Sequence, residues 1–339
     1  MDIVTKTPVI KLEHGSGGAL SRELVEHIIY PLLKSDIYSD LSDATLLGNI
    51  ADPMMTTDTY VIDPPMFPGG DIGELAVFGT SNDLAVSGGK PLFLSMGLVL
   101  EEGFSTATLR DVVKSAASAA RKWGVTIVTG DTKVVPAGKG GGIFINTTGI
   151  GERMFKKPLS PERIGNGDEI VVSGPVGSHG ISILAAREKL SVGSSLESDC
   201  AFLYPLCESL FALDENLRFM RDATRGGIAA ILNEITQGRN WGIDVKEHLF
   251  PITQQVKSVS EILGLNPLEV ANEGVFVAVV APGEGRRTVG LLNRFKEGAQ
   301  AQVVGSVTSE HPGKVILETS IGGRRILDFP RGLLLPRIC

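Results

Sequence analysis

The sequence predicts an α/β protein of two domains with an arm at its C-terminal end. The chain has 339 residues. Domains usually hold about 100 to 200 residues, so this length fits two domains or one large one. Its 41 glycines fall mainly at the ends of apolar runs, where α/β proteins place their turns. Helical and strand-like patterns both occur along these runs, and this mixture predicts the α/β fold.

Helices in the first half of the chain are indicated by spacing and by capping residues. They are expected at residues 19–34, from Asp71 towards Ser87, and at residues 108–123. Leucine and isoleucine recur at helical spacing in the first helix, which Pro31 is expected to kink or end. Asp71 and Glu74 form a capping box for the second, and Gly124 ends the third.

Strands of the first domain are predicted from short apolar runs between these helices. They are expected at residues 44–49, 54–57, 92–100, 125–129 and 143–149. The texture of the sequence changes after Gly151, because residues 154–168 carry lysines, prolines and glycines typical of a linker. We therefore place the first domain at residues 1–153.

The second domain is placed at residues 154–320, and its regular elements begin near Asp168. Strands are expected at residues 169–173, 275–280 and 302–307, and helices at residues 180–190, 226–236 and 285–295. After Ser320 a basic segment contains so many glycines and prolines that it cannot continue a helix or a central strand. Residues 321–339 are therefore predicted to form a mobile arm.

Composition and charge exclude several kinds of protein. Hydrophobic residues make up 42% and charged residues 21%, which supplies a packed core and no signature of disorder. The net charge of −7 disfavours binding to nucleic acid. Apolar runs such as residues 92–100 are far shorter than a membrane span, and residues 1–6 are too polar for a signal peptide. We expect a cytoplasmic protein with no nucleic-acid or membrane partner.

The three cysteines cannot form a disulfide framework, and no zinc motif accompanies them, which fits a reducing compartment. Cys200 and Cys207 lie in an apolar segment with helical spacing, so we expect them in the core. Cys339 is the last residue and follows the arm. It is either an unremarkable surface thiol or a functional one. The adjacent α-carboxylate raises its pKa, so it needs a binding partner or an acceptor group to act as a nucleophile.

The common nucleotide and hydrolase motifs are missing. Gly88-Gly89-Lys90 is followed by Pro91 rather than by the rest of a phosphate loop, and the glycines near residue 15 lack the dinucleotide fingerprint. No Gly-x-Ser-x-Gly or His-Glu-x-x-His occurs either. Classical P-loop and Rossmann proteins, serine hydrolases and zincins therefore lose support.

Four aspartates stand at predicted element boundaries: Asp43, Asp58, Asp83 and Asp131. Taken singly, each is more simply a turn or cap residue. Together with the glycine-rich residues 15–18 and 138–142, they also suit a site where Mg²⁺ bridges carboxylates to a triphosphate. Lys133 would add a positive charge or, if desolvated, a base, although it would equally suit a solvated surface.

Two motifs of the second domain also invite a chemical interpretation. Glu273 precedes the apolar residues 275–280, so it is either a general base at the mouth of a strand or part of a turn. Residues 221–227 come just before a predicted helix, whose amide-rich N-terminus favours anions. A simple cap by Thr224 explains part of that motif equally well.

Taken together, the motifs resemble the HypE family of hydrogenase maturation proteins, which are carbamoyl dehydratases. The resemblance covers nearly the whole chain and is carried by residues 14–18, 67–73, 82–85, 130–135, 221–227, 271–274 and 336–339. The glycine and aspartate motifs are shared with aminoimidazole ribonucleotide synthetase (PurM) and selenophosphate synthetase, whereas the ending Pro-Arg-Ile-Cys is specific to HypE. Ala223 and Gly141 depart from the family pattern without touching a proposed catalytic group.

The resemblance implies a PurM-like two-domain fold whose N-terminal sheets pair across a homodimer, with ATP in a cleft under the glycine-rich loop. It also implies roles for residues of this chain. Those expected to bind the nucleotide are Gly15, Ser16, Gly17, Gly18, Asp58, Asn82 and Asn146. Those expected to hold Mg²⁺ are Asp43, Asp58, Asp83 and Asp131.

The implied reaction takes place on the terminal cysteine. The carbamoyltransferase HypF would place a carbamoyl group on Cys339, and this chain would use ATP to dehydrate it to a thiocyanate. Phosphorylation of the carbamoyl oxygen provides a leaving group, and Glu273 with Lys133 close by would handle the proton. The cyanide would pass to iron on a HypC–HypD complex. The alternatives are another enzyme of the superfamily or a nucleotide-sensing scaffold that presents its tail.

Overall fold

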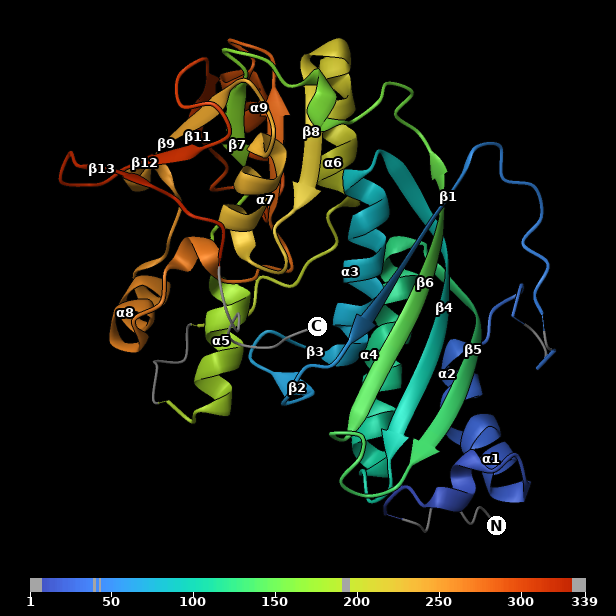
Figure 1. Cartoon of the computed structure of the whole chain (residues 1–339). Coiled ribbons are helices and arrows are strands. Elements are labelled where there is room, and N and C mark those ends of the chain that lie inside the picture. The colour runs from blue at the N-terminus through green and yellow to red at the C-terminus, as the bar shows by residue number, and fades with distance from the viewer. Residues whose placement is uncertain (1–7, 39–40, 43, 191–195, 331–339) are drawn as a thin grey trace.

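Two α/β parts lie side by side in the computed structural model, which describes residues 8–38, 41–42, 44–190 and 196–330 (Figure 1). The N-terminal part contains a sheet in the order β1-β6-β4-β5, in which only the β4–β5 pair is parallel. Its strands are β1 (Pro53–Tyr60), β4 (Gly89–Glu101), β5 (Thr126–Val135) and β6 (Ile143–Arg153). A small hairpin, β2 (Met66–Phe67) and β3 (Gly70–Asp71), directly precedes α3 (Ile72–Val86).

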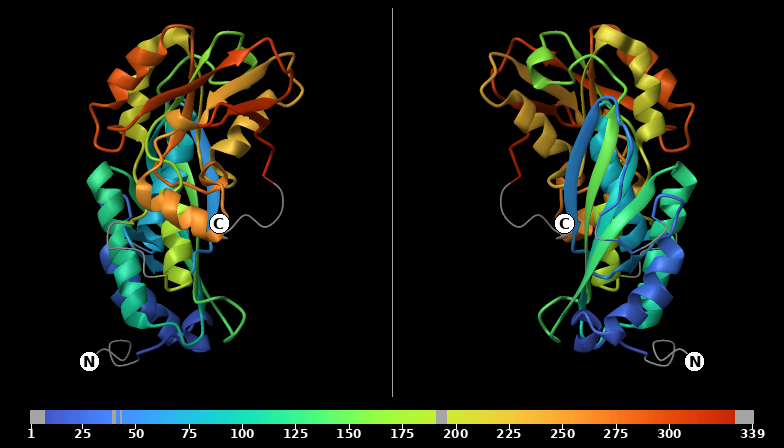
Figure 2. Two further views of the ribbon diagram at one scale, coloured as in Figure 1. Left: turned by 90° about the vertical axis from the view of Figure 1, so that its left-hand side faces the viewer. Right: turned by 90° about the vertical axis from the view of Figure 1, so that its right-hand side faces the viewer.

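Within the part of the chain that the structure describes, helices cover one face of this sheet. They are α3 (Ile72–Val86) and α4 (Thr106–Trp123), and Figure 2 shows α4 on one side of the strands. The alternation of burial along β4 follows from this arrangement, because Leu94, Met96, Leu98 and Leu100 are buried while the residues between them are only partly so. We call the other side, which faces the viewer in Figure 1, the open face of the sheet.

Local capping places both helices where the sequence predicts them. Asp71 Oδ1 accepts hydrogen bonds from the amides of Gly73 and Glu74 at 2.7 and 3.2 Å, which fixes the start of α3. Ser105 caps α4, so this helix begins two residues earlier than predicted. It ends at Gly124, whose φ of 71° only glycine adopts readily.

The first helical region is interrupted, although Pro31 does not end it. It consists of α1 (Ala19–Leu24), a π-helical segment (Val25–Ile29) and α2 (Tyr30–Leu33). The π-helical segment comes directly before the turn that contains Pro31, which cannot donate a backbone hydrogen bond to the preceding turn. The irregular backbone therefore lies at the predicted place, while the helix continues beyond the proline.

One predicted strand of this part is wrong. Residues 44–49 form no strand, and Leu46 is 92% exposed. The segment instead contacts β5 near its start, where the Thr45 hydroxyl donates to the Val128 carbonyl at 2.6 Å. Its apolar residues do not match a neighbouring strand, and alternation without a pairing partner does not make a sheet.

The C-terminal part contains a seven-stranded sheet in the order β13-β12-β9-β11-β7-β10-β8. Its strands are β7 (Glu169–Val172), β8 (Leu217–Asp222), β9 (Gly242–Lys246), β10 (Phe276–Val280), β11 (Gln302–Thr308), β12 (Val315–Glu318) and β13 (Arg324–Ile326). Its helices are α5 (Ser178–Arg187), α6 (Tyr204–Leu210), α7 (Gly227–Thr236), α8 (Gln254–Leu263) and α9 (Gly285–Leu292). The predicted elements β7, β10, β11, α5, α7 and α9 are confirmed, and the others were not predicted individually.

The arm begins later than residue 321. Arg324–Ile326 pairs with β12 at the edge of the sheet, and Leu327 is fully buried. Glycines and prolines do exclude a helix here, but they allow a short edge strand. The chain is thus attached to the C-terminal sheet beyond residue 321, and residues 331–339, which include Cys339, lie outside the described residues.

The two parts share one apolar core. Phe202 of the C-terminal part stacks on Trp123 with ring centroids 4.9 Å apart and lies 6.1 Å from Phe78 of α3. Helix α3 also packs against α6 and β8. This shared core fixes α3 between the two sheets. Within the described residues, none of the helices has the length and apolar character needed to span a bilayer.

Candidate active site

Five carboxyl groups gather where the two parts meet, and we call them the junction cluster: Asp58, Asp83, Asp199, Asp222 and Glu273. Asp58 belongs to β1, Asp83 to the last turns of α3, and Asp222 ends β8. Glu273 is only 4% exposed and stands just before β10, as its motif predicted. The loop that contains Asp199 lies against it, since Asp199 accepts from the Glu273 amide at 3.2 Å.

Burial changes the acid–base properties of this cluster. It is the main cause that raises the pKa of Glu273 well above its ordinary value, and Asp222, Asp199, Asp58 and Asp83 add to the rise. Burial, with Asp83 nearby, raises the pKa of Asp222 to about 7. Burial also raises the pKa of Asp199 to about 6, although backbone amides bonded to it oppose the rise. Burial therefore favours the protonated forms of Glu273, Asp222 and Asp199.

Asp83 occupies an intermediate environment. Its pKa is raised, first by burial and also by Asp58, while a 2.8 Å hydrogen bond from the Thr56 hydroxyl opposes the rise. Arg221 and Arg225 also favour its ionised form. A cavity of about 470 Å³ opens here, lined by Thr56, Asp83, Arg221 and Asp222 together with Met54, Met55, Leu84, Val86, Ser87, Leu159, Phe219 and Met220. Polar atoms of the cluster thus border a space that a ligand can enter.

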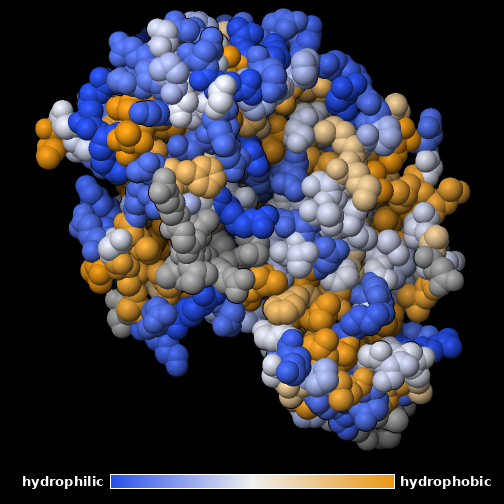
Figure 3. Space-filling view, in the orientation of Figure 1, coloured by the Kyte–Doolittle hydropathy of each residue, from blue (hydrophilic) through white to orange (hydrophobic). Residues whose placement is uncertain are grey.

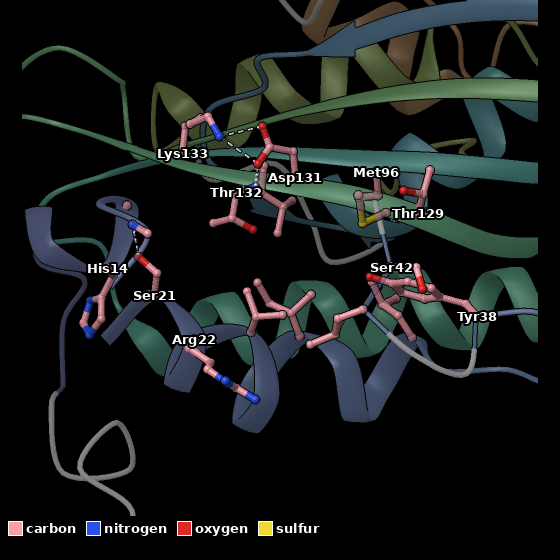
Figure 4. A pocket seen from close by; sticks show the side chains of 18 residues that line it. His14, Ser21, Arg22, Tyr38, Ser42, Met96, Thr129, Asp131, Thr132 and Lys133 are labelled. Carbon is pink, nitrogen blue, oxygen red and sulfur yellow. Dashed lines mark hydrogen bonds and ion pairs between the residues drawn. The ribbon is translucent and has the colours of Figure 1, made fainter. Parts of the chain in front are cut away.

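A second group of predicted residues lies beside the N-terminal glycine loop. Gly15 packs so closely on β5 that an added Cβ would lie 2.7 Å from the Val134 amide nitrogen. The Gly17 amide donates to the Ser21 hydroxyl at 2.9 Å. The adjacent His14 is buried, and burial lowers its pKa. The loop, α1, α2, β4 and β5 enclose a cavity of about 460 Å³, whose lining includes Gly15, Gly17, Asp131 and Lys133 (Figure 4).

Ser16 and Gly18 belong to the same loop but make different contacts. The Ser16 hydroxyl donates to the Leu12 carbonyl at 3.3 Å. Gly18 precedes α1, where its carbonyl accepts from the Arg22 amide at 3.1 Å. The predicted glycine loop therefore leads directly into a helix. At this position backbone amides can face an anion.

Asp131 and Lys133 project from β5 on the side away from α1 and α2 (Figure 4). They form an ion pair of 2.7 Å with side chains 66% and 63% exposed. Lys133, first by its hydrogen bond, lowers the pKa of Asp131. The sequence expectation of a desolvated Lys133 is therefore not met within a single chain.

Lys133 and Glu273 also lie on different sides of the N-terminal sheet. Thr59, Asn146, Gly97 and Asp131 are register partners in one row across the four strands. Three strand spacings of about 4.8 Å separate β1 from β5 by roughly 14 Å. Asp58 is paired with the buried Thr147 and so points towards α3, opposite to the open face that carries Asp131. The expected closeness of Lys133 to Glu273 is thus wrong within one chain.

The structure gives two predicted nucleotide ligands other contacts. The Asn146 side-chain amide donates to the Asp58 carbonyl and to the Thr59 hydroxyl, both at 2.9 Å, and lies on the open face. Asn82 is 1% exposed. Among the residues that the structure describes, its side chain hydrogen-bonds only to backbone groups of residues 201, 203 and 273. Its amide is therefore used between the two parts of the chain rather than in a cavity.

The second glycine-rich stretch is used internally. Glu101 accepts a hydrogen bond from the Gly142 amide at 2.7 Å and another from Gly138. These amides lower the pKa of Glu101. Because a carboxylate of the same chain takes them, residues 138–142 do not present a free phosphate loop. The sequence could not distinguish these uses, since both require glycine amides that converge on an anion.

Residues 221–227 contribute Asp222 to the junction cluster. They do not form the predicted side-chain cap of a helix. Helix α7 is preceded by Gly226 with φ of 76°, so the predicted cap by Thr224 is wrong. Arg221 pairs with Glu234 at 2.5 Å. Sequence reasoning missed Asp222, which lies inside this motif, and Asp199, whose only signal is its place beside Cys200. Cys207 is buried as predicted, but Cys200 is half-buried beside the cluster, where burial and then Glu273 raise its pKa.

The residues expected to hold Mg²⁺ are only partly together. Asp43 lies outside the described residues. Among the residues that are described, no three His, Cys, Asp or Glu side chains converge as a metal site. Asp58 and Asp83 are close enough to influence each other electrostatically. Mg²⁺ in nucleotide sites is usually bound by one or two carboxylates plus phosphate oxygens, so this pair fits the protein side of such a site.

The fold and site define the chain as an AIR synthase related protein. Residues 42–153 match the AIR synthase related protein N-terminal domain, and residues 165–318 match the corresponding C-terminal domain. The described fold, a PurM-like pair of α/β domains, agrees with these matches.

Individual relatives narrow this class. The chain is 43% identical over 333 residues to the carbamoyl dehydratase HypE of Rhodobacter capsulatus, which covers 97% of this chain and 98% of that protein. It is 40% identical to HypE of Escherichia coli K12, with coverage of 97% and 99%. A crystal structure of HypE in complex with ATP shares 40% identity and a TM-score of 0.92, with coverage of 97% and 99%. The chain belongs to the HypE family of carbamoyl dehydratases.

Proposed function

We propose that this chain is an ATP-dependent carbamoyl dehydratase that converts a carbamoyl group on its own Cys339 to a thiocyanate. The observation that carries the proposal is a buried carboxyl, Glu273, whose pKa is raised by burial and by neighbours that include Asp222 and Asp83, two residues that line a cavity. It stands in a chain related to carbamoyl dehydratases over nearly its full length. A solved HypE contains ATP, which supports ATP as the second substrate.

The chemistry balances with ATP as the dehydrating agent. The carbamoyl oxygen attacks the γ-phosphorus, the bond to the β-phosphate oxygen breaks, and ADP leaves. The bond between the carbamoyl carbon and the phosphorylated oxygen then breaks, and phosphate is released. Both nitrogen-bound protons are lost, which leaves a carbon–nitrogen triple bond. Glu273, once ionised, accepts one of these protons, and the departing phosphate takes the other. Its raised pKa makes it a stronger base than an ordinary carboxylate.

Mg²⁺ would neutralise charge on the transferring phosphoryl group. Asp58 and Asp83 are the residues of the junction cluster that would hold it. The Thr56 hydroxyl orients Asp83 by its 2.8 Å hydrogen bond. Arg221 and Arg225, which act electrostatically on Asp83, would add positive charge at this end of the site.

The open face supports a homodimer in which each active site uses both chains. One row of this face carries only hydroxyl side chains, on Thr57, Thr148, Ser95 and Thr129. A neighbouring row carries Met55, which is 73% exposed, with Ile150 and Phe93. Figure 3 shows this mixture of hydrophobic and hydrophilic residues on the side that faces the viewer. Such a face suits burial against a second sheet. The partner chain would then supply Asp131 and Lys133.

Partners follow from the family and from one solved assembly. A crystal structure described as a HypE–HypF complex shares 39% identity with this chain and a TM-score of 0.79, and it covers 92% of this chain. We therefore propose HypF as the source of the carbamoyl group. We also propose a HypC–HypD complex as the cyanide acceptor and the cytoplasm as the location, both of which rest on the family resemblance.

The reaction can be followed on the C-terminal peptide by mass spectrometry. Incubation with HypF, carbamoyl phosphate and ATP should add a carbamoyl group to the peptide and then remove one water. Cys339→Ala should show neither change. Glu273→Gln should accept the carbamoyl group and keep it, because the amide cannot take the proton. Dehydration of Glu273→Gln at the wild-type rate would remove Glu273 from the mechanism.

A further inference from the structure

One buried amide on α3 holds two loops of the C-terminal part. The side-chain nitrogen of Asn82 donates to the Ala201 carbonyl at 2.9 Å and to the Glu273 carbonyl at 3.3 Å. Its side-chain oxygen accepts from the Leu203 amide at 2.8 Å. With 1% of its surface exposed, Asn82 has little access to solvent or to a ligand. Three backbone groups of the C-terminal part are thus fixed by one residue of the N-terminal part.

The backbone of Glu273 is held on both sides. Its amide donates to Asp199 at 3.2 Å, and its carbonyl accepts from the Asn82 side chain at 3.3 Å and, more weakly, from the Ala201 amide at 3.5 Å. The following residue is equally restricted, because a Cβ on Gly274 would lie 1.8 Å from the Asp199 carbonyl oxygen. A residue held at both peptide groups has little freedom to move its backbone, so the point from which its carboxyl group projects depends on the side chains of Asn82 and Asp199.

The position of Asn82 in α3 connects this support to the nucleotide side. The next residue, Asp83, bonds Thr56 of β1 and belongs to the pair proposed to hold Mg²⁺. The same turn of helix therefore carries Asp83, which lines the cavity and is proposed to hold Mg²⁺, and Asn82, which contacts the backbone of the proposed base. This arrangement sets the distance between the two without any flexible connection.

We propose that Asn82 is a positioning residue for Glu273, which it aligns through the peptide carbonyl, rather than a ligand of the nucleotide. The inference rests on the proposed function, in which Glu273 takes a proton from the carbamoyl nitrogen. Proton transfer requires heavy atoms within about 3 Å, and a misplacement of about 1 Å is able to cost a hundredfold in rate.

The test separates positioning from ATP binding and from simple stability. Asn82→Ala is compared with Asn233→Ala, a matched control in α7 whose amide donates to the Ala229 and Leu327 carbonyls at 2.8 and 3.0 Å. The readouts are thermal unfolding, ATP affinity and the rate of water loss from the carbamoylated C-terminal peptide. We expect Asn82→Ala to dehydrate about tenfold to a hundredfold more slowly with ATP affinity unchanged. The control should retain the wild-type rate.

A double substitution shows whether Asn82 acts through Glu273. Combined with Glu273→Asp, whose shorter carboxylate is already misplaced, Asn82→Ala should add much less than its separate effect. Full additivity would overturn the inference, as would a loss of ATP affinity that matches the loss of rate. If Asn82→Ala does not fold, Asn82→Ser takes its place, since its shorter hydroxyl cannot reach all three backbone groups.

Failure of this inference is distinguishable from failure of the proposed function. A wild-type rate for Asn82→Ala together with an inactive Glu273→Gln would overturn only the positioning role. A wild-type rate for Glu273→Gln would overturn the role of the base itself, and the positioning role with it.

Discussion

Burial, and then the neighbouring carboxylates, raise the pKa of Glu273 and so favour its neutral form, whereas only the ionised form can accept a proton. The rate of dehydration should therefore rise with pH through the pKa of Glu273. Asp222→Asn removes one negative neighbour and should move the midpoint to lower pH. The pH profile of water loss from the carbamoylated peptide measures both effects. Asp244→Asn, a carboxylate paired with Arg324 at 3.0 Å in the C-terminal sheet, should leave the midpoint unchanged.

The junction cluster also links stability to pH. The pKa of Asp222 is raised to about 7 by burial and by Asp83. The folded chain thus binds this proton more tightly than the unfolded chain does, and stability falls as pH rises from the ordinary carboxyl range towards 7. Asp222→Asn removes this loss. The difference in the free energy of unfolding between Asp222→Asn and the wild type should therefore favour the variant more at pH 8 than at pH 5, by at least about 1 kcal/mol. Denaturant titrations that give equal advantages at both pH values would contradict this.

Two glycines give a matched pair for a packing test. A Cβ at Gly274 would meet the Asp199 carbonyl oxygen at 1.8 Å, whereas one at Gly290 in α9 meets nothing within 4 Å. Gly274→Ala should destabilise the fold by more than about 2 kcal/mol, since backbone must move. Gly290→Ala should stabilise it by about 0.5 to 1 kcal/mol, since alanine favours a helix. Thermal unfolding of both variants tests this, and a Gly274→Ala protein as stable as wild type would refute the described packing.

Single residues were predictable where a motif places them at the end of an element. Glu273 was found because an apolar run follows it. Asp83 was found because it lies near the end of a helix whose capped start the sequence indicates. The role of Asp199 and the contacts of Asn82 were not predictable in this way. Both residues bond the backbone of Glu273, which lies 74 residues from Asp199 and 191 residues from Asn82 along the chain. Such contacts depend on how α3 meets the C-terminal part, which no local pattern encodes.

The β5–β6 connection offers a test at the level of elements. Glu101 accepts from the amides of Gly138 and Gly142, and these bonds lower its pKa. A lowered pKa means that the ionised carboxylate holds the loop at neutral pH, and that this support is lost as pH falls through the pKa of Glu101. Glu101→Ala should speed hydrogen exchange at these two amides at pH 7. Exchange at the cap of α3 serves as the internal reference, and unchanged exchange at residue 142 would show that the carboxylate does not hold the loop.

Elements with local signals were predicted better than those that need a partner. Asp71, Ser105 and Gly124 fix the ends of α3 and α4 by contacts within a few residues. The strand expected at residues 44–49 failed because its alternation has no neighbour to pair with. Conversely, β8 and β13 contain charged residues that obscure the strand pattern in the sequence. They are recognised as strands only from their pairing with β10 and β12.

At the scale of the whole molecule, the proposed shared active site makes a complementation test possible. Lys133→Ala and Glu273→Gln should each be inactive alone. A mixture refolded together should regain about a quarter of wild-type activity, because half of the dimers are mixed and each holds one intact site. Refolding each variant separately before mixing provides the control. If both residues act within one chain, every chain in the mixture lacks one of them and no activity returns.

Strand β13 is attached to the edge of the C-terminal sheet. This attachment shortens the stretch of chain between the sheet and Cys339, the proposed site of carbamoylation. Nine residues follow Pro330, the last of them Cys339, and at about 3.3 Å per residue they span at most about 30 Å, against about 60 Å for a 19-residue tether. Halving the radius reduces the sphere searched about eightfold and raises the effective concentration of the thiol in proportion. Under the proposed function, a carbamoyl donor would therefore have to come to the body of this protein, and a modified Cys339 would meet its own catalytic pocket at high local concentration.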